Sequence, residues 1–285
     1  MRNSVVVTGA ATGIGRACVA KVVAEGGHAF ATVRKEADVA DLKAAFGSAV
    51  TPLVADVTDA AAVRRASDSV RAALGEDTLM GLVNNAGIAV PGPLLHLSAE
   101  ELREQMEVNL IGVHTTTLAF APLMGVEPGR IGAPGRIVMI SSVAGKNAMP
   151  FIGAYAASKH ALEGYSEALR RELMLFGIDV IVIGPGSVTT PIWDKAEANG
   201  LERYHNTPYG PMVPKAQAYM LSRGRAGLPA SDLGDLVWRA LTMAKPKTRY
   251  AILRNRFFDS TLPNMLPKRV VDGLVARTLG LKPKS

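Results

Sequence analysis

Residues 4–15 read SVVVTGAATGIG, a run of small and β-branched residues followed by a turn rich in glycine. The run predicts a strand buried on both faces, and the turn leads into a helical pattern. Glycines let the backbone turn tightly and approach a pyrophosphate, and a helix N-terminus offers that anion free N–H groups. The spacing is G-x-x-x-G-x-G rather than G-x-G-x-x-G, and we expect a dinucleotide site at Gly9, Thr12, Gly13, Ile14 and Gly15.

Short apolar runs alternate with longer amphipathic stretches along the rest of the chain. The apolar runs predict strands at Ser4–Val7, His28–Val33, Val50–Ala55, Met80–Val83, Ile137–Ile140, Val180–Ile183 and Tyr250–Leu253. The amphipathic stretches predict helices at Gly13–Glu25, Val39–Phe46, Asp59–Leu74, Ala99–Met124, Ala154–Phe176 and Asp232–Met243. This alternation is typical of an α/β fold, and we predict a doubly wound parallel sheet of the Rossmann type.

Local signals mark several helix ends and the domain limits. Ser98 and Glu101 form a capping-box pattern ahead of a helix, and glycines stand where helices should stop, at Gly26, Gly27, Gly47, Gly75 and Gly177. The Gly/Pro stretch Gly125–Gly135 is too short to separate domains. We therefore predict a single dinucleotide-binding and catalytic domain at residues 1–255, with a substrate cap at about residues 187–230, and a basic amphipathic C-terminal arm at residues 256–285.

The composition excludes several classes of protein. Hydrophobic residues make up 48% of the 285 residues and charged residues 20%, as in a soluble globular protein. Cys18 is the single cysteine, which excludes an intrachain disulfide and a cysteine-rich metal site; the five histidines lack zinc-site spacing, so no metal is expected. No apolar run is long enough to cross a bilayer, and the first strand leaves no room for a signal peptide, so we expect a cytoplasmic protein.

The net charge of +7 is concentrated near the C-terminus. Residues 245–285 hold ten Lys/Arg and two Asp/Glu, whereas the remaining 244 residues hold 22 basic and 23 acidic residues. Two interpretations of this basic arm are open: a solvated tail, or a patch for an anionic surface such as a phosphorylated carrier substrate or lipid headgroups. Nucleic acid is not expected as a partner, because the chain has no recognised nucleic-acid module.

Large apolar residues gather in the cap and in the arm. Those of the arm follow a nearly helical period, and three uses compete: covering the substrate pocket, packing against a second subunit, or peripheral contact with an anionic membrane. Those of the cap suit an apolar substrate and equally suit packing of the cap on the body. The residues are Trp193, Tyr204, Tyr209, Met212, Tyr219, Met220 and Leu221 in the cap and Met265, Leu266, Val270, Val271, Leu274, Val275 and Leu279 in the arm.

Polar or small residues follow the second, third and fourth predicted strands. Arg34 and Lys35 stand where NAD-preferring sites place an acidic residue, and a guanidinium can clamp a 2′-phosphate with two hydrogen bonds. We therefore favour NADP over NAD. Asp56, followed by Val57, is placed to accept a hydrogen bond from an adenine amino group. The residues after the fourth strand suit close packing on a ribose, at Asn85, Ala86 and Gly87.

Tyr155 and Lys159 are four residues apart on a predicted helix and share one face. Ser142 ends the preceding strand, and Asn109 stands mid-helix, where asparagine competes with the backbone. A free tyrosine has a pKa of about 10, too high for a base near neutral pH, and a nearby ammonium favours the phenolate. We expect Lys159, together with the positive nicotinamide ring, to lower the pKa of Tyr155, and Ser142 to stabilise the developing alkoxide. In the reverse direction Tyr155 donates its proton to a carbonyl that receives hydride.

These motifs, in this order, resemble the short-chain dehydrogenase/reductase family in its single-domain branch. The matching pieces are TGAATGIG at Thr8–Gly15, DV at Asp56–Val57, NNAG at Asn84–Gly87, VNL around Asn109, ISS at Ile140–Ser142, YAASK at Tyr155–Lys159 and PGSVTT at Pro185–Thr190. The resemblance implies Tyr155 as acid/base, Lys159 as nicotinamide-ribose ligand and pKa modulator, and Ser142 as donor to the substrate oxygen. It also implies that Asn109 holds a water in a proton relay, and that the nicotinamide carboxamide is bound by Pro185, Gly186, Val188 and Thr190.

The cofactor and the partners follow from the same resemblance. Ala-Thr-x-Arg, ending at Arg34, is similar to NADP-preferring members that include steroid and retinol dehydrogenases. Thr12 stands where many relatives have a serine or a basic residue, so a second cation for the 2′-phosphate is missing there. The resemblance implies a homodimer or homotetramer.

We predict an NADP-dependent oxidoreductase that transfers hydride between nicotinamide and a secondary alcohol or ketone of an apolar substrate, of steroid, retinoid or acyl type. The alternatives are a 3-oxoacyl-carrier ketoreductase and a non-catalytic NADP-binding sensor on the same fold. The presence of all four catalytic residues argues against the sensor.

Overall fold

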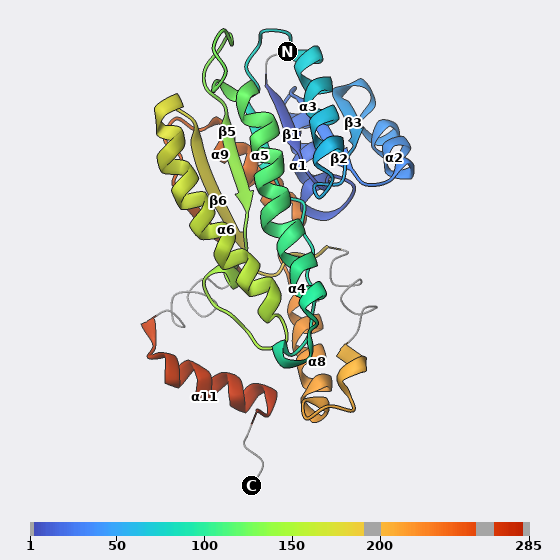
Figure 1. Cartoon of the computed structure of the whole chain (residues 1–285), viewed down its shortest axis with the longest axis vertical. Helices are drawn as coiled ribbons and strands as arrows, with labels where there is room; N and C mark the ends of the chain where they lie inside the picture. Colours follow the sequence, from blue (N-terminus) through green and yellow to red (C-terminus); the bar gives the residue numbers. More distant parts are fainter. Residues whose placement is uncertain (1–2, 191–200, 255–264, 282–285) are drawn as a thin grey trace.

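The computed structural model describes residues 3–190, 201–254 and 265–281. Within them, seven strands form one parallel sheet in the order β3-β2-β1-β4-β5-β6-β7 (Figure 1). The strands are β1 Ser4–Val7, β2 His28–Val33, β3 Val50–Val54, β4 Gly81–Asn84, β5 Arg136–Ile140, β6 Asp179–Pro185 and β7 Arg249–Ile252. The doubly wound parallel sheet predicted from the sequence is confirmed, and every predicted strand is present.

Helices cover both faces of the sheet and the edge where the strands end (Figure 1). One face carries α1 Gly13–Ala24, α2 Glu36–Phe46 and α9 Ala230–Thr242; the other carries α3 Ala60–Leu74, α5 Gly112–Phe120 and α6 Gly153–Glu172. Beyond the strand ends lie α4 Ala99–Met106, α8 Val213–Arg225 and α11 Lys268–Leu279. Short 3-10 turns are η1 Gly47–Ala49, η2 Leu94–His96, η4 Ala121–Met124, η5 Val143–Gly145, η6 Leu173–Phe176, η7 Leu201–Tyr204 and η8 Gly210–Met212.

Alternate residues of each strand belong to two separate apolar clusters, because successive side chains of a strand point to opposite faces of the sheet. In β1, Val5 and Val7 pack with α1, α2 and α9, whereas Val6 packs with α3, α5 and α6. All three side chains are completely buried. Burial on both faces explains why these strands are continuous apolar runs, and it fixes the sheet edge on which the site is built.

The predicted helix Ala99–Met124 is continuous in direction but changes type along its length. The capping box of Ser98 and Glu101 starts α4 as predicted. A π-helical segment, η3 Glu107–Ile111, then separates α4 from α5. Asn109 lies in this segment and is completely buried. Such π segments are frequent at functional sites, and in this one Asn109 Nδ2 donates to Ser158 Oγ of α6 at 3.0 Å.

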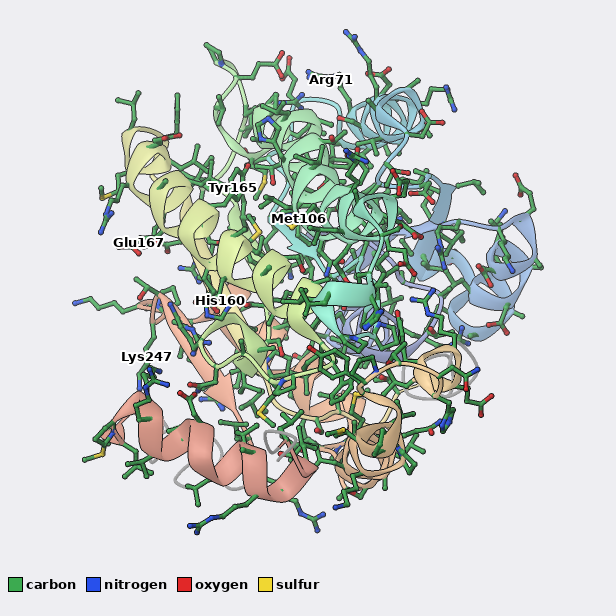
Figure 2. All side chains as sticks on the ribbon, turned by 60° about the horizontal axis from the view of Figure 1, so that its bottom comes forward. Arg71, Met106, His160, Tyr165, Glu167 and Lys247 are labelled. Carbon is green, nitrogen blue, oxygen red and sulfur yellow. The ribbon has the colours of Figure 1, made fainter. Side chains whose placement is uncertain are left out.

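A third apolar cluster joins the cap to the arm. Its core is Phe151, Leu201, Tyr204, Val213, Ala216 and Leu279, with Val275 and Leu281 of the arm packed against it. Figure 2, in which the bottom of Figure 1 comes forward, shows α11 and α8 side by side at this end. Trp193 of the cap lies outside the described residues, as do residues 256–264 and 282–285 of the arm. None of the described helices is long and apolar enough to span a membrane.

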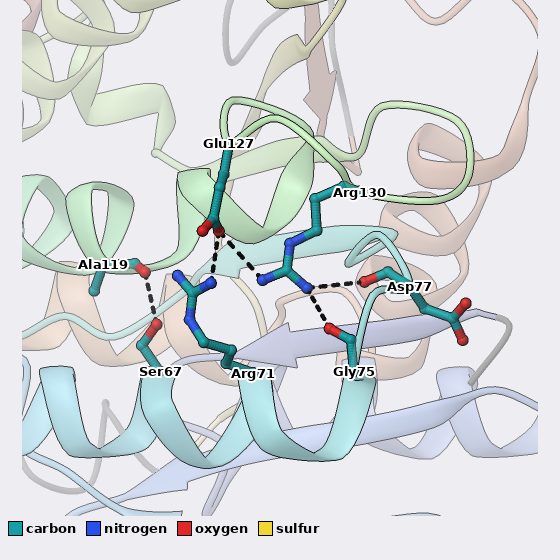
Figure 3. Close-up of polar contacts among 7 residues, drawn as sticks. All are labelled: Ser67, Arg71, Gly75, Asp77, Ala119, Glu127 and Arg130. Atoms are coloured by element: carbon teal, nitrogen blue, oxygen red, sulfur yellow. Dashed lines mark hydrogen bonds and ion pairs between the residues drawn. The ribbon is translucent and has the colours of Figure 1, made fainter.

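The Gly/Pro loop of residues 125–135 is fastened to the end of α3 by two arginines on one carboxylate (Figure 3). Arg71 and Arg130 donate to the same oxygen of Glu127, at 2.6 and 3.3 Å. Arg130 also donates to the carbonyls of Gly75 and Asp77, at 2.6 and 3.5 Å, and its side chain is only 7% exposed. A buried arginine with these partners ties the loop before β5 to the helix on the same face.

Replacing Arg130 should therefore destabilise the protein. We expect Arg130→Ala to lower the free energy of unfolding by about 2 kcal/mol, because the carbonyls it serves lose charge-assisted hydrogen bonds. The matched control is Arg103→Ala, which also removes a pair with a glutamate three residues earlier but from a side chain 74% exposed. Urea unfolding measures both variants. An equal loss of unfolding free energy in the two variants, or no loss in Arg130→Ala, would contradict a stabilising role for Arg130.

Candidate active site

The carboxyl ends of the strands open into one cavity of about 1570 Å³. It receives nearly every site residue predicted from the sequence, although these come from segments far apart in the chain. Gly15 and Asn109 are the two that do not line it. The residues that do are Gly9, Thr12, Gly13, Ile14, Arg34, Lys35, Asp56, Val57, Asn85, Ala86, Gly87, Ser142, Tyr155, Lys159, Pro185, Gly186, Val188 and Thr190.

Gly15 acts through close packing instead. A Cβ there would lie 2.3 Å from the Gly9 carbonyl oxygen and 2.6 Å from Asn85 Nδ2. Gly9 and Gly13 have φ of +64° and +57°, a region that L side chains rarely adopt. Asn85 Nδ2 donates to the carbonyls of Thr8 and Gly9 at 2.9 and 3.2 Å. The glycine turn is thus fastened to the end of β4, and this side chain serves the turn.

The turn and the end of β2 together fit a phosphorylated dinucleotide. No side chain caps the start of α1, where Thr12 is the N-cap, so its first N–H groups face the cavity without a side-chain acceptor. Arg34 is exposed, lines the same cavity and makes no ion pair with any described residue. Free N–H groups and a free guanidinium suit the pyrophosphate and a 2′-phosphate respectively.

Asp56 and the segment after β6 complete the lining. Asp56 Oδ1 accepts hydrogen bonds from Thr58 N and Oγ1, at 3.0 and 2.8 Å, which fixes the carboxylate at the end of β3. At the end of β6, a Cβ on Gly186 would lie 2.5 Å from Leu253 Cδ2, and Val188 pairs with Leu228 in an isolated bridge. The segment from Pro185 to Thr190 is therefore held in place along the cavity wall.

Tyr155, Lys159 and Ser142 meet on one wall of the cavity. Tyr155 and Lys159 extend from the first turns of α6, and Lys159 Nζ lies 5.8 Å from the centroid of the Tyr155 ring. Nζ donates to the carbonyl of Ile140 at 2.8 Å. Ser142 Oγ accepts from Ala144 N at 3.1 Å and contacts the Tyr155 phenol through a hydrogen bond. The three groups that the sequence predicts to act together are thus brought together.

In the protein without a cofactor, the pKa of Tyr155 lies above its ordinary value. Desolvation raises the pKa of the phenol, and the hydrogen bond with Ser142 only partly opposes this. Burial also lowers the pKa of Lys159 to about 8, against the charge of Glu163. The lowering expected from Lys159 together with the nicotinamide ring stays a prediction, because helix spacing reports the proximity of the two groups but not the loss of water around them.

Asn109 and Gln105 form a ladder that holds the segment after β4. Asn109 exchanges two hydrogen bonds with the backbone of Ile88, at 2.9 and 3.0 Å, and donates to Ser158 Oγ at 3.0 Å. Gln105, one turn earlier, bonds the backbone of Ile88 and Val90 at 2.9 and 2.8 Å. The water relay that the resemblance implies for Asn109 stays a prediction.

Sequence reasoning missed two residues near the site and left the place of one group open. Gln105 was recognisable by its position one turn before Asn109, and Glu163 by its position one turn after Lys159. The open group is the cavity-lining face of the arm, for which covering the substrate pocket was one of three uses considered. It comprises Leu266, Lys268, Val271, Asp272, Leu274, Val275, Thr278 and Leu279.

Comparison with known proteins agrees with this geometry. A family model described as short chain dehydrogenase matches residues 3–200. The NADPH-dependent 3-dehydrocapnine reductase of Ornithobacterium rhinotracheale is 35% identical over 274 residues, 96% of each chain. Retinol dehydrogenase 16 of Mus musculus is 30% identical over 299 residues, which cover 98% of this chain and 89% of the relative.

Among solved structures, a short chain dehydrogenase/reductase from Burkholderia phymatum in complex with NAD is similar, with a TM-score of 0.77 and 27% identity over 95% of both chains. The resemblance stated from the motifs is confirmed over nearly the whole length. The chain therefore belongs to the short-chain dehydrogenase/reductase family and is an oxidoreductase.

Proposed function

We propose that this oxidoreductase uses NADPH to reduce a ketone of an apolar substrate to a secondary alcohol. The observation that carries the proposal is the convergence of Tyr155, Ser142 and Lys159 on the wall of a cavity that Arg34 also lines. A phenol is protonated at neutral pH, which is the state that can give a proton to a carbonyl oxygen.

The roles of the side chains follow from this arrangement. NADPH, when bound, supplies the hydride. Tyr155 donates its proton to the substrate oxygen as negative charge develops there, and Ser142 donates a second hydrogen bond to the same oxygen. Lys159, held by the carbonyl of Ile140, binds the nicotinamide ribose and places a positive charge beside the phenolate that remains.

NADP preference rests on Arg34 and on the absence of a carboxylate at the first two positions after β2. The adjacent Lys35 is also exposed and lines the cavity, which adds a second positive charge near the expected 2′-phosphate. The NADPH dependence of the Ornithobacterium relative supports the same choice.

The apolar substrate is supported by the part of the cavity beyond Tyr155. Met149, Ile152 and Met220 line it from the body and the cap, and Val271 and Val275 line it from α11. An apolar alcohol, retinol, is named for one relative. We propose that α11, which lies within the arm predicted at residues 256–285, covers the pocket of the catalytic domain predicted at residues 1–255. A carrier-bound 3-oxoacyl substrate is the second candidate, since the arm is basic and α11 places Lys268 in the cavity wall.

We further propose a cytoplasmic homodimer or homotetramer. Apolar residues left exposed on α5 and in η6 support association, namely Leu118, Met174 and Leu175. Peripheral contact of the basic arm with an anionic membrane remains a prediction.

The central test removes the phenol hydroxyl. A panel of apolar ketones with NADPH, followed by absorbance, first identifies a substrate that the wild type reduces. We expect Tyr155→Phe to lower turnover about 1000-fold, because the proton proposed to reach the substrate oxygen is lost, and to leave NADPH binding largely unchanged. Tyr165→Phe on the same helix is the control, since its hydroxyl bonds His114 at 3.1 Å, outside the cavity. A Tyr155→Phe enzyme that keeps most of its rate would overturn the proposal.

The cofactor preference is tested at Arg34. We expect Arg34→Ala to raise the Kd for NADPH about 30-fold, since charge-assisted hydrogen bonds to the 2′-phosphate are lost, and to change the Kd for NADH by less than about threefold. Fluorescence titration with the two cofactors measures both values, so NADH serves as the internal control. Equal weakening for NADH and NADPH would show that Arg34 does not read the 2′-phosphate.

The role of α11 as a pocket cover is tested with two adjacent valines. Val271 lines the cavity, whereas Val270 is 47% exposed and does not line it. We expect Val271→Asp to raise KM for the apolar ketone about tenfold by placing a charge against it, and Val270→Asp to change KM little. Steady-state kinetics with the substrate found in the panel decides. Equal effects of the two substitutions would remove α11 from the substrate site.

A further inference from the structure

A buried ion pair lies directly behind the catalytic lysine. Glu163 follows Lys159 by one turn of α6, and its side chain is only 7% exposed. Arg249 of β7 donates to both carboxylate oxygens, from Nε at 2.9 and 3.1 Å and from Nη2 at 3.1 Å. Lys146, just after η5, adds its Nζ at 3.3 Å. The carboxylate thus joins α6, β7 and the segment that follows Ser142.

The backbone is shaped to admit this pair. A Cβ on Gly145 would lie 2.9 Å from Ser141 Oγ, 3.0 Å from the Lys159 carbonyl oxygen and 3.1 Å from Glu163 Cγ. A Cβ on Gly184 would lie 2.5 Å from Arg249 Nη2 and 3.4 Å from the Ser142 carbonyl oxygen. The pair therefore packs against Gly145 and Gly184, two glycines that also lie close to the backbone carbonyls of Lys159 and Ser142.

Glu163 is ionised in this environment. Burial alone would raise its pKa, but hydrogen bonds from Arg249 and Ser141, with the charges of Arg249 and Lys146, outweigh burial and hold the pKa below its ordinary value. A buried carboxylate that keeps its charge acts strongly on charges nearby, because little water screens it. Lys159 is such a neighbour: burial lowers its pKa to about 8, and the charge of Glu163 opposes that fall.

We propose that Glu163 and Arg249 are a positioning pair that sets the charge state of Lys159 and fixes the Ser142 segment beside it. The inference rests on the proposed function, in which the ammonium of Lys159 must be present during ketone reduction. Glu163 supplies the negative charge that favours the ammonium, and Arg249 limits that effect by neutralising part of the same charge. The two members of the pair therefore act on Lys159 in opposite directions.

The other groups around Lys159 do not produce opposite shifts of its pKa in these two variants. The carbonyl of Ile140 on β5 is neutral, the side chain that η3 turns towards α6 is the neutral Asn109, and β6 presents Gly184. The charged or titratable side chains that surround Glu163 and Lys159 in the described residues come from α6, β7 and the segment after η5. They are Tyr155, His160, Arg249 and Lys146.

The test measures the titration of Lys159 directly in the full chain without cofactor. Lysine labelled with ¹³C at Cε is followed by NMR from pH 6 to pH 11, and the Lys159 signal is identified by its loss in Lys159→Met. In the wild type we expect a midpoint near pH 8. Glu163→Gln should lower the midpoint by about one unit, and Arg249→Met should raise it. Glu167→Gln is the matched control, because Glu167 pairs with Arg171 on the exposed side of the same helix (Figure 2).

Opposite shifts in the two variants establish the proposal, since loss of packing alone has no reason to change sign. Shifts in the same direction, or none, overturn it. If Glu163→Gln does not fold, Glu163→Asp keeps the charge and should keep the wild-type midpoint, while Arg249→Met alone still tests the sign.

The same variants are then compared in NADPH binding across this pH range. Because Lys159 is proposed to bind the ribose as an ammonium, the pH at which binding weakens should follow the NMR midpoint. The NMR titration needs no turnover. A chain that reduces no ketone would therefore contradict the proposed function without contradicting the pair, and the reverse also holds.

Discussion

The parallel register of the sheet is the constraint on which the site depends. Each pair of neighbouring strands runs parallel, so all their carboxyl ends meet along one edge. That register gathers Gly9, Arg34, Ser142 and Pro185 around one cavity although the chain separates them widely. The hydrogen bonds from Asn85 to the glycine turn hold two of these ends in a fixed relation. The fold therefore supplies the geometry of the site, and the residues at the strand ends supply its chemistry.

Burial then decides the charge states inside that geometry. The same removal of water that raises the pKa of Tyr155 also lowers the pKa of Lys159. A site built only from these two groups would risk losing the ammonium near the pH at which the enzyme works. The carboxylate of Glu163, held ionised by Arg249, Ser141 and Lys146 together, counteracts that loss from a position outside the cavity lining.

The sequence predicted what local patterns control. Strands such as Ser4–Val7 and His28–Val33 match residue for residue because short runs of small and apolar residues, buried on both faces, are typical of parallel strands. The π segment at Glu107–Ile111 was not predicted, since its cause is the long-range bonding of Asn109 to Ile88 and Ser158. The direction of the Tyr155 pKa depends on surrounding atoms that no motif reports, and the destination of α11 depends on α8, which lies some fifty residues earlier.

The position of α11 has a consequence for protein engineering. The helix lines the cavity and rests on the cap, yet it contributes nothing to the two apolar clusters that hold the sheet together. A library of variants restricted to residues 268–279 can therefore explore new shapes of ligand without eroding the scaffold or its reactive groups. Substitutions in α11 can therefore change which ligands fit the cavity while the residues at the strand ends stay the same.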